Sequence, residues 1–208
     1  MPKYFILMAD IVESQLRTPV PLMREFKKIA RCINDEHAYN FLSPVTITLG
    51  DEFQAVVRSP KDGVQAIIAF EEMIIHKKAD FKIRYLLHYG EIETPINREA
   101  AYGMLGSGLT EARKLLVEMK RSKQRFRFRL GEEIVSEKMN LAFVLYQSIV
   151  DGWKPRDFYI LSEFFRSSDY KLVAKKLRKD TSLIWRRKKS LKVNDYAALK
   201  RLVEIICC

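Results

Sequence analysis

The stretch Val45-Thr46-Ile47-Thr48-Leu49-Gly50-Asp51-Glu52-Phe53 carries the strongest structural signal in the chain. β-Branched and apolar residues run up to Gly50-Asp51, a dipeptide that favours a two-residue turn between antiparallel strands. The pattern therefore predicts strands at residues 45–49 and 53–58, joined as a hairpin by Gly50-Asp51.

A second acidic turn, Ala9-Asp10-Ile11-Val12-Glu13-Ser14, follows an apolar run at residues 3–9 that predicts another strand. If this strand lies beside the hairpin, the carboxylates of Asp10 and Asp51 meet at one edge of a sheet. Carboxylates on neighbouring strands are a common way to hold Mg²⁺ against a polyphosphate. The alternative is two turn aspartates in water, because Asp is frequent at strand ends for its local hydrogen bonding.

The order of the predicted elements indicates an α+β fold. Strands are predicted at residues 3–9, 45–49, 53–58, 81–89 and 125–130, and helices after Pro21, at 61–77 and after the glycine-containing stretch 102–108. The order β-α-β-β-α-β is that of a ferredoxin-like sandwich, in which the first strand and the hairpin are central neighbours. From residue 131 onward the chain is predicted to be helical, so we expect an α+β domain at 1–130 and a helical module at 131–208.

The net charge of +11 is distributed unevenly. Residues 1–120 contain 16 basic and 16 acidic residues, whereas residues 121–208 contain 21 basic and 10 acidic residues. This asymmetry suggests a polyanionic partner for the C-terminal part. The longest uncharged apolar stretch, Leu141 to Val150, is too short to cross a bilayer, so no membrane partner is expected. Three cysteines fit neither a disulfide framework nor a metal spacing, which favours the cytoplasm.

The C-terminal helices predict a helix-turn-helix at about residues 168–192. Val173-Ala174-Lys175-Lys176-Leu177 fits the supporting helix, and Thr181 to Leu191 fits a recognition helix capped by Thr181 or Ser182. Trp185 fits either the core or a position against DNA, and the core is favoured. The alternative is a solvated basic cap packed on the first domain. The residues expected to contact DNA are Thr181, Ser182, Arg186, Arg187 and Lys189.

Together these motifs resemble a nucleotide-cyclase fold of class III, in which a strand ends in Asp-Ile, a hairpin carries Gly-Asp and a later helix carries a phosphate-binding Arg. The corresponding residues are Asp10-Ile11, Gly50-Asp51 and Arg113. Over nearly its full length the chain is similar to the SatD family of bacterial proteins. The similarity covers the Asp-Ile-x-x-Ser start, the Gly-Asp-Glu-Phe-Gln turn, the segment Gly90-Glu91-Ile92-Glu93-Thr94 and the C-terminal helices.

The cyclase resemblance implies a site for Mg²⁺ or Mn²⁺ formed by Asp10, Asp51 and the Ile11 carbonyl. It also implies a nucleotide whose phosphates lie near Gly50 and Arg113. One position departs from the pattern, because Leu109 stands where such cyclases place an Asn four residues before the Arg. We therefore expect a metal and phosphate site without the cyclising chemistry, and Arg113 is the one candidate for a transition-state contact.

Three functions compete on this basis. The favoured one is a DNA-binding regulatory protein, acting as a homodimer, whose cyclase-like domain senses a metal or nucleotide. The alternative is a Mg²⁺-dependent nucleotide cyclase or nucleotidyl-transferring enzyme that uses Asp10 and Asp51. A third is an interaction scaffold with a degenerate site.

Overall fold

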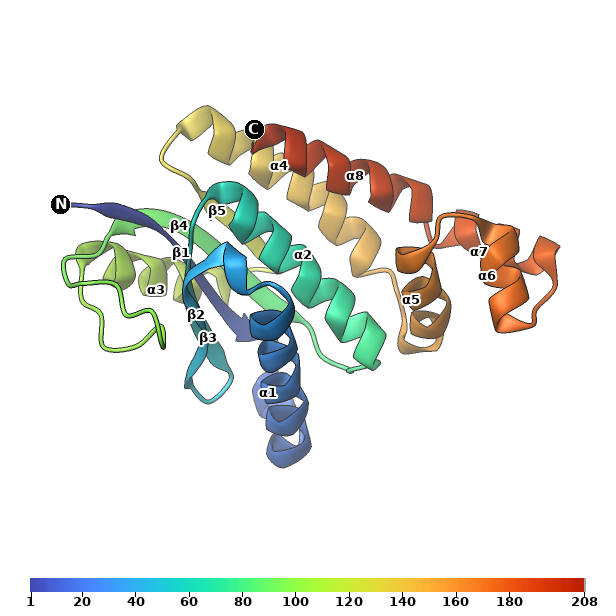
Figure 1. Ribbon diagram of the computed structural model, residues 1–208, viewed down its shortest axis with the longest axis horizontal. Helices are drawn as coiled ribbons and strands as arrows, with labels where there is room; N and C mark the ends of the chain where they lie inside the picture. Colours follow the sequence, from blue (N-terminus) through green and yellow to red (C-terminus); the bar gives the residue numbers. More distant parts are fainter. Residues whose placement is uncertain (208) are drawn as a thin grey trace.

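The computed structural model describes residues 1–207 of the chain and has an α+β architecture (Figure 1). Cys208 lies outside the described residues. The strands are β1 (Lys3–Ile11), β2 (Phe41–Leu49), β3 (Glu52–Val57), β4 (Ile83–Glu91) and β5 (Phe126–Arg129). The α-helices are α1 (Pro19–Glu36), α2 (Pro60–Lys77), α3 (Ser107–Met119), α4 (Glu133–Val150), α5 (Phe158–Arg166), α6 (Tyr170–Leu177), α7 (Thr181–Ser190) and α8 (Val193–Ile206).

The five strands form one mixed sheet in the order β2-β3-β1-β4-β5. β1 is antiparallel to both β3 and β4, and β5 is parallel to β4. The hairpin predicted at Gly50-Asp51 joins β2 to β3, and Gly50 has the positive φ of 57° that such a turn requires. The α+β order and the central position of β1 beside the hairpin are confirmed, with β5 added at the edge.

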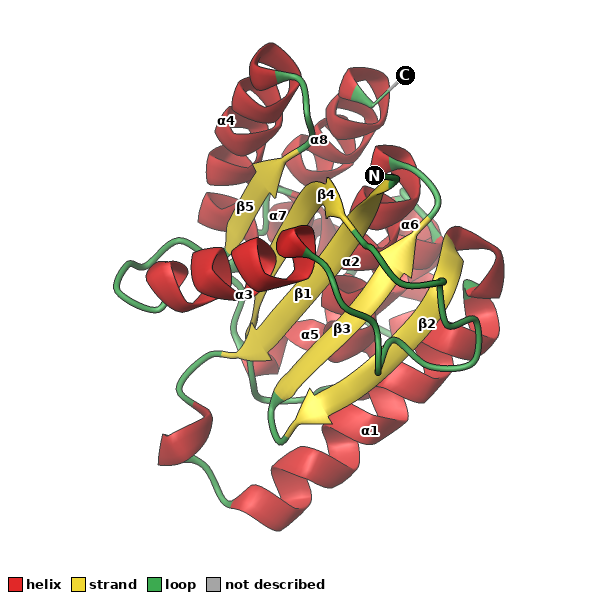
Figure 2. Cartoon of the chain, turned by 90° about the vertical axis from the view of Figure 1, so that its left-hand side faces the viewer, coloured by secondary structure: helices red, strands yellow, loops and turns green. Residues whose placement is uncertain are grey.

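Helices cover both faces of the sheet (Figure 2). Because side chains alternate along a strand, Leu7 and Tyr85 face a large apolar core shared with α1, α2 and α4, whereas Ile6 and Leu86 face a smaller core beneath α3. The larger core continues past residue 130 through α4 into α5 and α8. The domain boundary near residue 130 therefore stays a prediction, since apolar packing is continuous across it.

Close packing of α3 on the end of β4 depends on glycine. A Cβ on Gly108 would lie 2.4 Å from the backbone nitrogen of Glu91, and one on Gly106 would lie 2.4 Å from the Glu91 carbonyl oxygen. Backbone atoms cannot move aside as a flexible side chain can, so only glycine fits at these positions. The glycines at the start of α3 thus allow this helix to approach the end of β4 closely.

The C-terminal helices are joined to the sheet domain by a buried cation. Arg125, which precedes β5, donates to both carboxylate oxygens of Glu71 on α2 at 3.0 and 2.8 Å, and to the Ile83 carbonyl at 2.6 Å. Its Nε donates to Asp151 after α4 at 2.9 Å. Burial opposes the charge of Arg125, but Glu71 and Asp151 together raise its pKa above the ordinary value.

The predicted C-terminal helices are found close to their expected bounds, with α6, Arg178-Lys179-Asp180 and α7 following one another. α6 and α7 lie at the end of the molecule far from the sheet (Figure 1). Among residues 1–207, no helix is both long and apolar enough to cross a membrane.

Breaking the Arg125 network should destabilise the whole fold. We expect Glu71→Gln to lower the free energy of unfolding by about 3 kcal/mol, because it removes the more buried of the two carboxylates that balance the charge of the buried guanidinium. Urea denaturation followed by circular dichroism measures the change. The matched control is Glu118→Gln, which removes an exposed pair with Arg127 at 3.3 Å and should cost less than about 1 kcal/mol. Equal losses in the two variants would show that Arg125 does not hold the core together.

Candidate functional site

The predicted acidic site lies where β1 ends. Asp10 is directly opposite Glu52 of β3 on one side and Arg84 of β4 on the other. Directly paired residues of adjacent strands point to the same face, so these three side chains converge beside α3. Asp10 is only 2% exposed, although it is a carboxylate near a sheet edge.

The Asp10 carboxylate forms ion pairs with two cationic side chains. Nη1 of Arg84 lies 2.8 Å from Oδ1 and 2.9 Å from Oδ2 of Asp10. The ammonium of Lys120, just past the end of α3, lies 3.1 Å from Asp10 Oδ2 and 3.1 Å from Glu52 Oε1. Both oxygens of Asp10 therefore have positively charged partners supplied by the chain itself.

Asp51 does not share this cluster. It precedes Glu52 by one residue and belongs to the turn, and its carboxylate accepts a hydrogen bond from the hydroxyl of Ser14. Its backbone carbonyl accepts from the Ile11 amide at 3.1 Å. The two acidic turns are adjacent through this backbone bond, as expected, but Asp10 and Asp51 have different side-chain partners.

The other residues predicted for the site lie around it. Arg113 on α3 is half exposed, and its Nη2 is 3.9 Å from Glu52 Oε2. Gly50 lies in the turn of the hairpin, and the side chain of Ile11 is buried in the larger core. Leu109 packs into the smaller core, so its departure from the cyclase pattern has a structural role here.

The electrostatics of the cluster reflect its burial. Burial raises the pKa of Asp10 above its ordinary value, and Arg84 and Lys120 counteract part of that rise. Partial burial lowers the pKa of Lys120, but its hydrogen bonds to Asp10 and Glu52 outweigh this and raise it. Asp10, Arg84, Lys120 and Glu52 form one coupled network, in which the charge of each group affects that of its neighbours.

This arrangement does not fit a divalent metal. Mg²⁺ and Mn²⁺ need carboxylate oxygens that face one another, whereas the oxygens of Asp10 are already paired with Arg84 and Lys120 and the Asp51 carboxylate lies apart, with one oxygen bonded by Ser14. Within residues 1–207, no group of three or more His, Cys, Asp or Glu side chains is placed to hold a metal ion. We therefore derive no chemistry through a metal at Asp10 and Asp51.

Arg84 and Lys120 were not among the predicted site residues. Arg84 had a sequence signal, because it interrupts an apolar strand at a position that shares the buried face of Leu86. Its Nε is buried and has no hydrogen-bond partner among the described residues. A cavity of about 590 Å³ lies beside Arg84 and Lys120, between the end of β1, the start of β4 and the end of α4.

The predicted recognition helix differs in detail from expectation. Asp180, rather than Thr181 or Ser182, caps α7 by accepting from the Leu183 amide at 2.9 Å. Trp185 is 42% exposed instead of belonging to the core, with the Lys189 ammonium 3.9 Å from its ring centroid. Arg187 turns away from this face and pairs with Asp157. Thr181, Ser182 and Arg186 are exposed.

The coupling in the acidic cluster gives a measurable consequence. We expect Lys120→Met to raise the pKa of Asp10 further, because Lys120 now favours the ionised carboxylate. Carbon-detected NMR titration of the Asp10 carboxyl measures this shift. Lys114→Met is the matched control, since Lys114 is an exposed lysine of α3, the helix that ends just before Lys120. A pKa for Asp10 that is unchanged in Lys120→Met would contradict the assigned contact.

The raised pKa of Asp10 in the wild type also determines how the stability of the fold depends on pH. The pKa of Asp10 in the folded state is raised above 3.8, so the folded protein binds this proton more tightly than the unfolded chain does. The stabilisation from that proton is complete below pH 3.8 and is lost as the pH rises through the folded-state pKa. In Lys120→Met the loss should extend to higher pH than in the wild type.

Solved structures with some likeness to this chain are nucleotide cyclases. A bacterial light-regulated adenylyl cyclase is 19% identical with a TM-score of 0.43, and the match covers 61% of this chain and 42% of that chain. A monomeric guanylyl cyclase domain from the aquatic fungus Blastocladiella emersonii is 16% identical with a TM-score of 0.38, covering 56% and 77%. A guanylate cyclase domain from Catenaria anguillulae, solved in complex with GTP, is 16% identical with a TM-score of 0.35, covering 56% and 75%.

The chain thus spans less than half the length of the bacterial adenylyl cyclase. At these identities and TM-scores the likenesses carry no argument about the activity of this chain. A search of the curated proteins found no match. The model of the SatD family matches residues 4–202, which is nearly the whole chain. The chain belongs to the SatD family.

Proposed function

We propose that this protein is a DNA-binding regulatory protein whose recognition element is α7, presented at the end of the molecule by α6. The observation that carries this proposal is the exposed face of α7. Ser182, Trp185 and Lys189 follow one another at helical spacing, and Thr181 and Arg186 flank them. All five are exposed, whereas Ile184 packs inward.

The chemistry of this face suits a nucleic-acid backbone. The Thr181 hydroxyl at the start of the helix and cations further along it match the usual phosphate contacts of recognition helices. Residues 168–208 contain 12 basic and 4 acidic residues, so α7 lies in the most basic part of the chain. An exposed Trp185 with Lys189 over its ring adds an apolar surface that a sugar or base edge can contact.

The contacts of α7 revise the set of residues expected to bind DNA. Arg187 is paired with Asp157, and the Lys188 ammonium donates to the Ser168 carbonyl at 2.7 Å. These two side chains secure α7 against the loop before α5 and the loop before α6. The Ser182 hydroxyl donates to the Asp180 carboxylate at 2.5 Å, so it has no proton left for a phosphate. The proposed DNA contacts are accordingly Thr181, Trp185, Arg186 and Lys189.

A homodimer is part of this proposal, because two recognition helices ordinarily match two half-sites on a duplex. The role proposed for the N-terminal domain is that of a sensor for a nucleotide or another anion, not a catalyst. The enzyme alternative loses support from the acidic cluster, where protein cations already neutralise Asp10.

The proposal is tested by fluorescence anisotropy with a labelled duplex over a range of salt concentrations. We expect wild-type binding to weaken steeply with salt, because bound cations displace counterions from the phosphates. The double variant Arg186→Gln, Lys189→Gln should lose about tenfold or more in affinity and lower the slope of log K against log salt by about 2.

The matched control is Lys114→Gln with Lys138→Gln, which changes the net charge equally on the exposed surfaces of α3 and α4. This control should keep most of the affinity. Duplex binding that is absent in the wild type, or lost equally in both double variants, rules out α7 as a recognition helix.

A further inference from the structure

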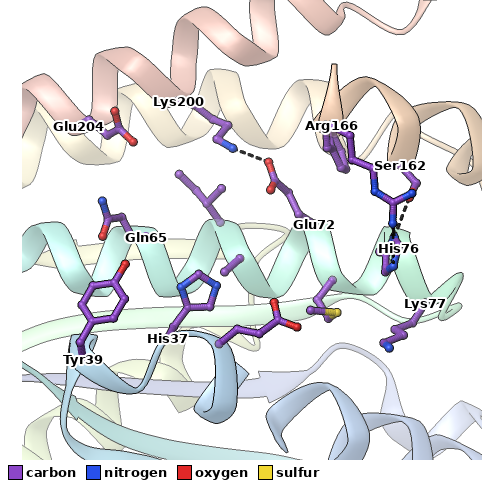
Figure 3. Close-up of a pocket in the computed structure, with 15 residues that line it drawn as sticks. His37, Tyr39, Gln65, Glu72, His76, Lys77, Ser162, Arg166, Lys200 and Glu204 are labelled. Carbon is purple, nitrogen blue, oxygen red and sulfur yellow. Dashed lines mark hydrogen bonds and ion pairs between the residues drawn. The ribbon is translucent and has the colours of Figure 1, made fainter. Parts of the chain in front are cut away.

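A groove of about 600 Å³ separates α2 from the C-terminal helices α5 and α8 (Figure 3). The turn after α1 closes its lower side. Its floor is apolar and is formed by Ile68, Ala69 and Met73 of α2 with Phe165 of α5. A volume of this size accommodates a small organic molecule.

The polar groups of the groove are not spread evenly. At one end lie four groups, here named the cationic end: His76, Lys77, Ser162 and Arg166. Gln65 and Glu204 lie toward the opposite end, as Figure 3 shows. Between the ends, the Glu72 carboxylate forms an ion pair with the Lys200 ammonium at 2.5 Å and accepts a hydrogen bond from the Tyr196 hydroxyl at 2.8 Å.

The cationic end brings together more donors than acceptors: the acceptors near it are the carboxylate of Glu163, which contacts Arg166, and that of Glu36, which also lines the groove. His76 Nδ1 is 2.8 Å from the Ser162 hydroxyl, and the Arg166 guanidinium is 3.4 Å from the other ring nitrogen. Glu163 accepts from Arg166 at 3.0 Å and also pairs with Lys176 at 2.6 Å, so one carboxylate serves two cations. The ammonium of Lys77 has no ion pair among the described residues.

The pKa of His76 reflects the same excess of positive over negative groups at the cationic end. Partial burial and the neighbouring cations Arg166 and Lys77 lower the pKa of His76, and the carboxylates of Glu163 and Glu36 offset only part of this. A bound anion would satisfy the guanidinium, the ammonium and the hydroxyl at once, and it would favour the charged imidazole.

We propose that this groove binds a small organic oxyanion, either a carboxylate or a phosphate monoester. Its charged head lies in the cationic end and its apolar body lies on the floor formed by α2 and α5. Because α2 belongs to the sheet domain and α5 to the C-terminal helices, such a ligand bridges the two parts of the chain. The proposal stands apart from DNA binding and is tested without DNA.

The probes are phenyl phosphate and benzoate, titrated into the full-length protein and followed by calorimetry and by NMR of the histidine rings. We expect saturable binding of at least one probe, with a rise in the pKa of His76 while His88, which is buried away from the groove, stays unchanged. Tighter binding of phenyl phosphate assigns a phosphate monoester, and tighter binding of benzoate assigns a carboxylate.

The decisive variant is Arg166→Gln, which should weaken binding by about tenfold or more. Arg156→Gln makes the same charge change at an exposed site outside the groove and should leave the affinity unchanged. Lys77→Gln is a second variant that should also weaken binding. No saturable binding of either probe, or equal affinities in the Arg166 and Arg156 variants, overturns the proposal.

Discussion

The rest of the structure depends on the ion pairs and hydrogen bonds made by the buried guanidinium of Arg125. It bonds α2 through Glu71, the first residue of β4 through a backbone carbonyl, and the end of α4 through Asp151. A charge in this position is tolerated only because two carboxylates and a carbonyl surround it. The same contacts fix where α4 leaves the sheet, and α4 in turn carries α8.

A second buried charge network organises the opposite face of the sheet. Asp10, Arg84 and Lys120 tie β1, β4 and the end of α3 together. In a metalloenzyme the countercharge of such a carboxylate is a bound ion, which comes and goes. Here the countercharges come from side chains of the chain itself, Arg84 and Lys120. The coupling also means that removing Lys120 changes the proton affinity of Asp10.

The C-terminal helices have two distinct surfaces. α5 and α8 face the sheet domain across a groove with an apolar floor and one cationic end. α7 faces outward at the far end of the molecule. A ligand in the groove would contact both α2 and α5, and α5 leads through α6 to α7.

The sequence by itself determined the elements: the hairpin at Gly50-Asp51, the α+β order and the limits of α6 and α7 all follow from local turn, cap and periodicity signals. Only the tertiary structure decided how side chains meet. Strand parity makes Glu52, not Asp51, the cross-strand neighbour of Asp10, and sheet order brings Arg84 beside it. Lys120, Arg187 and Trp185 likewise acquired their partners or exposure from packing between distant segments, which no local pattern encodes.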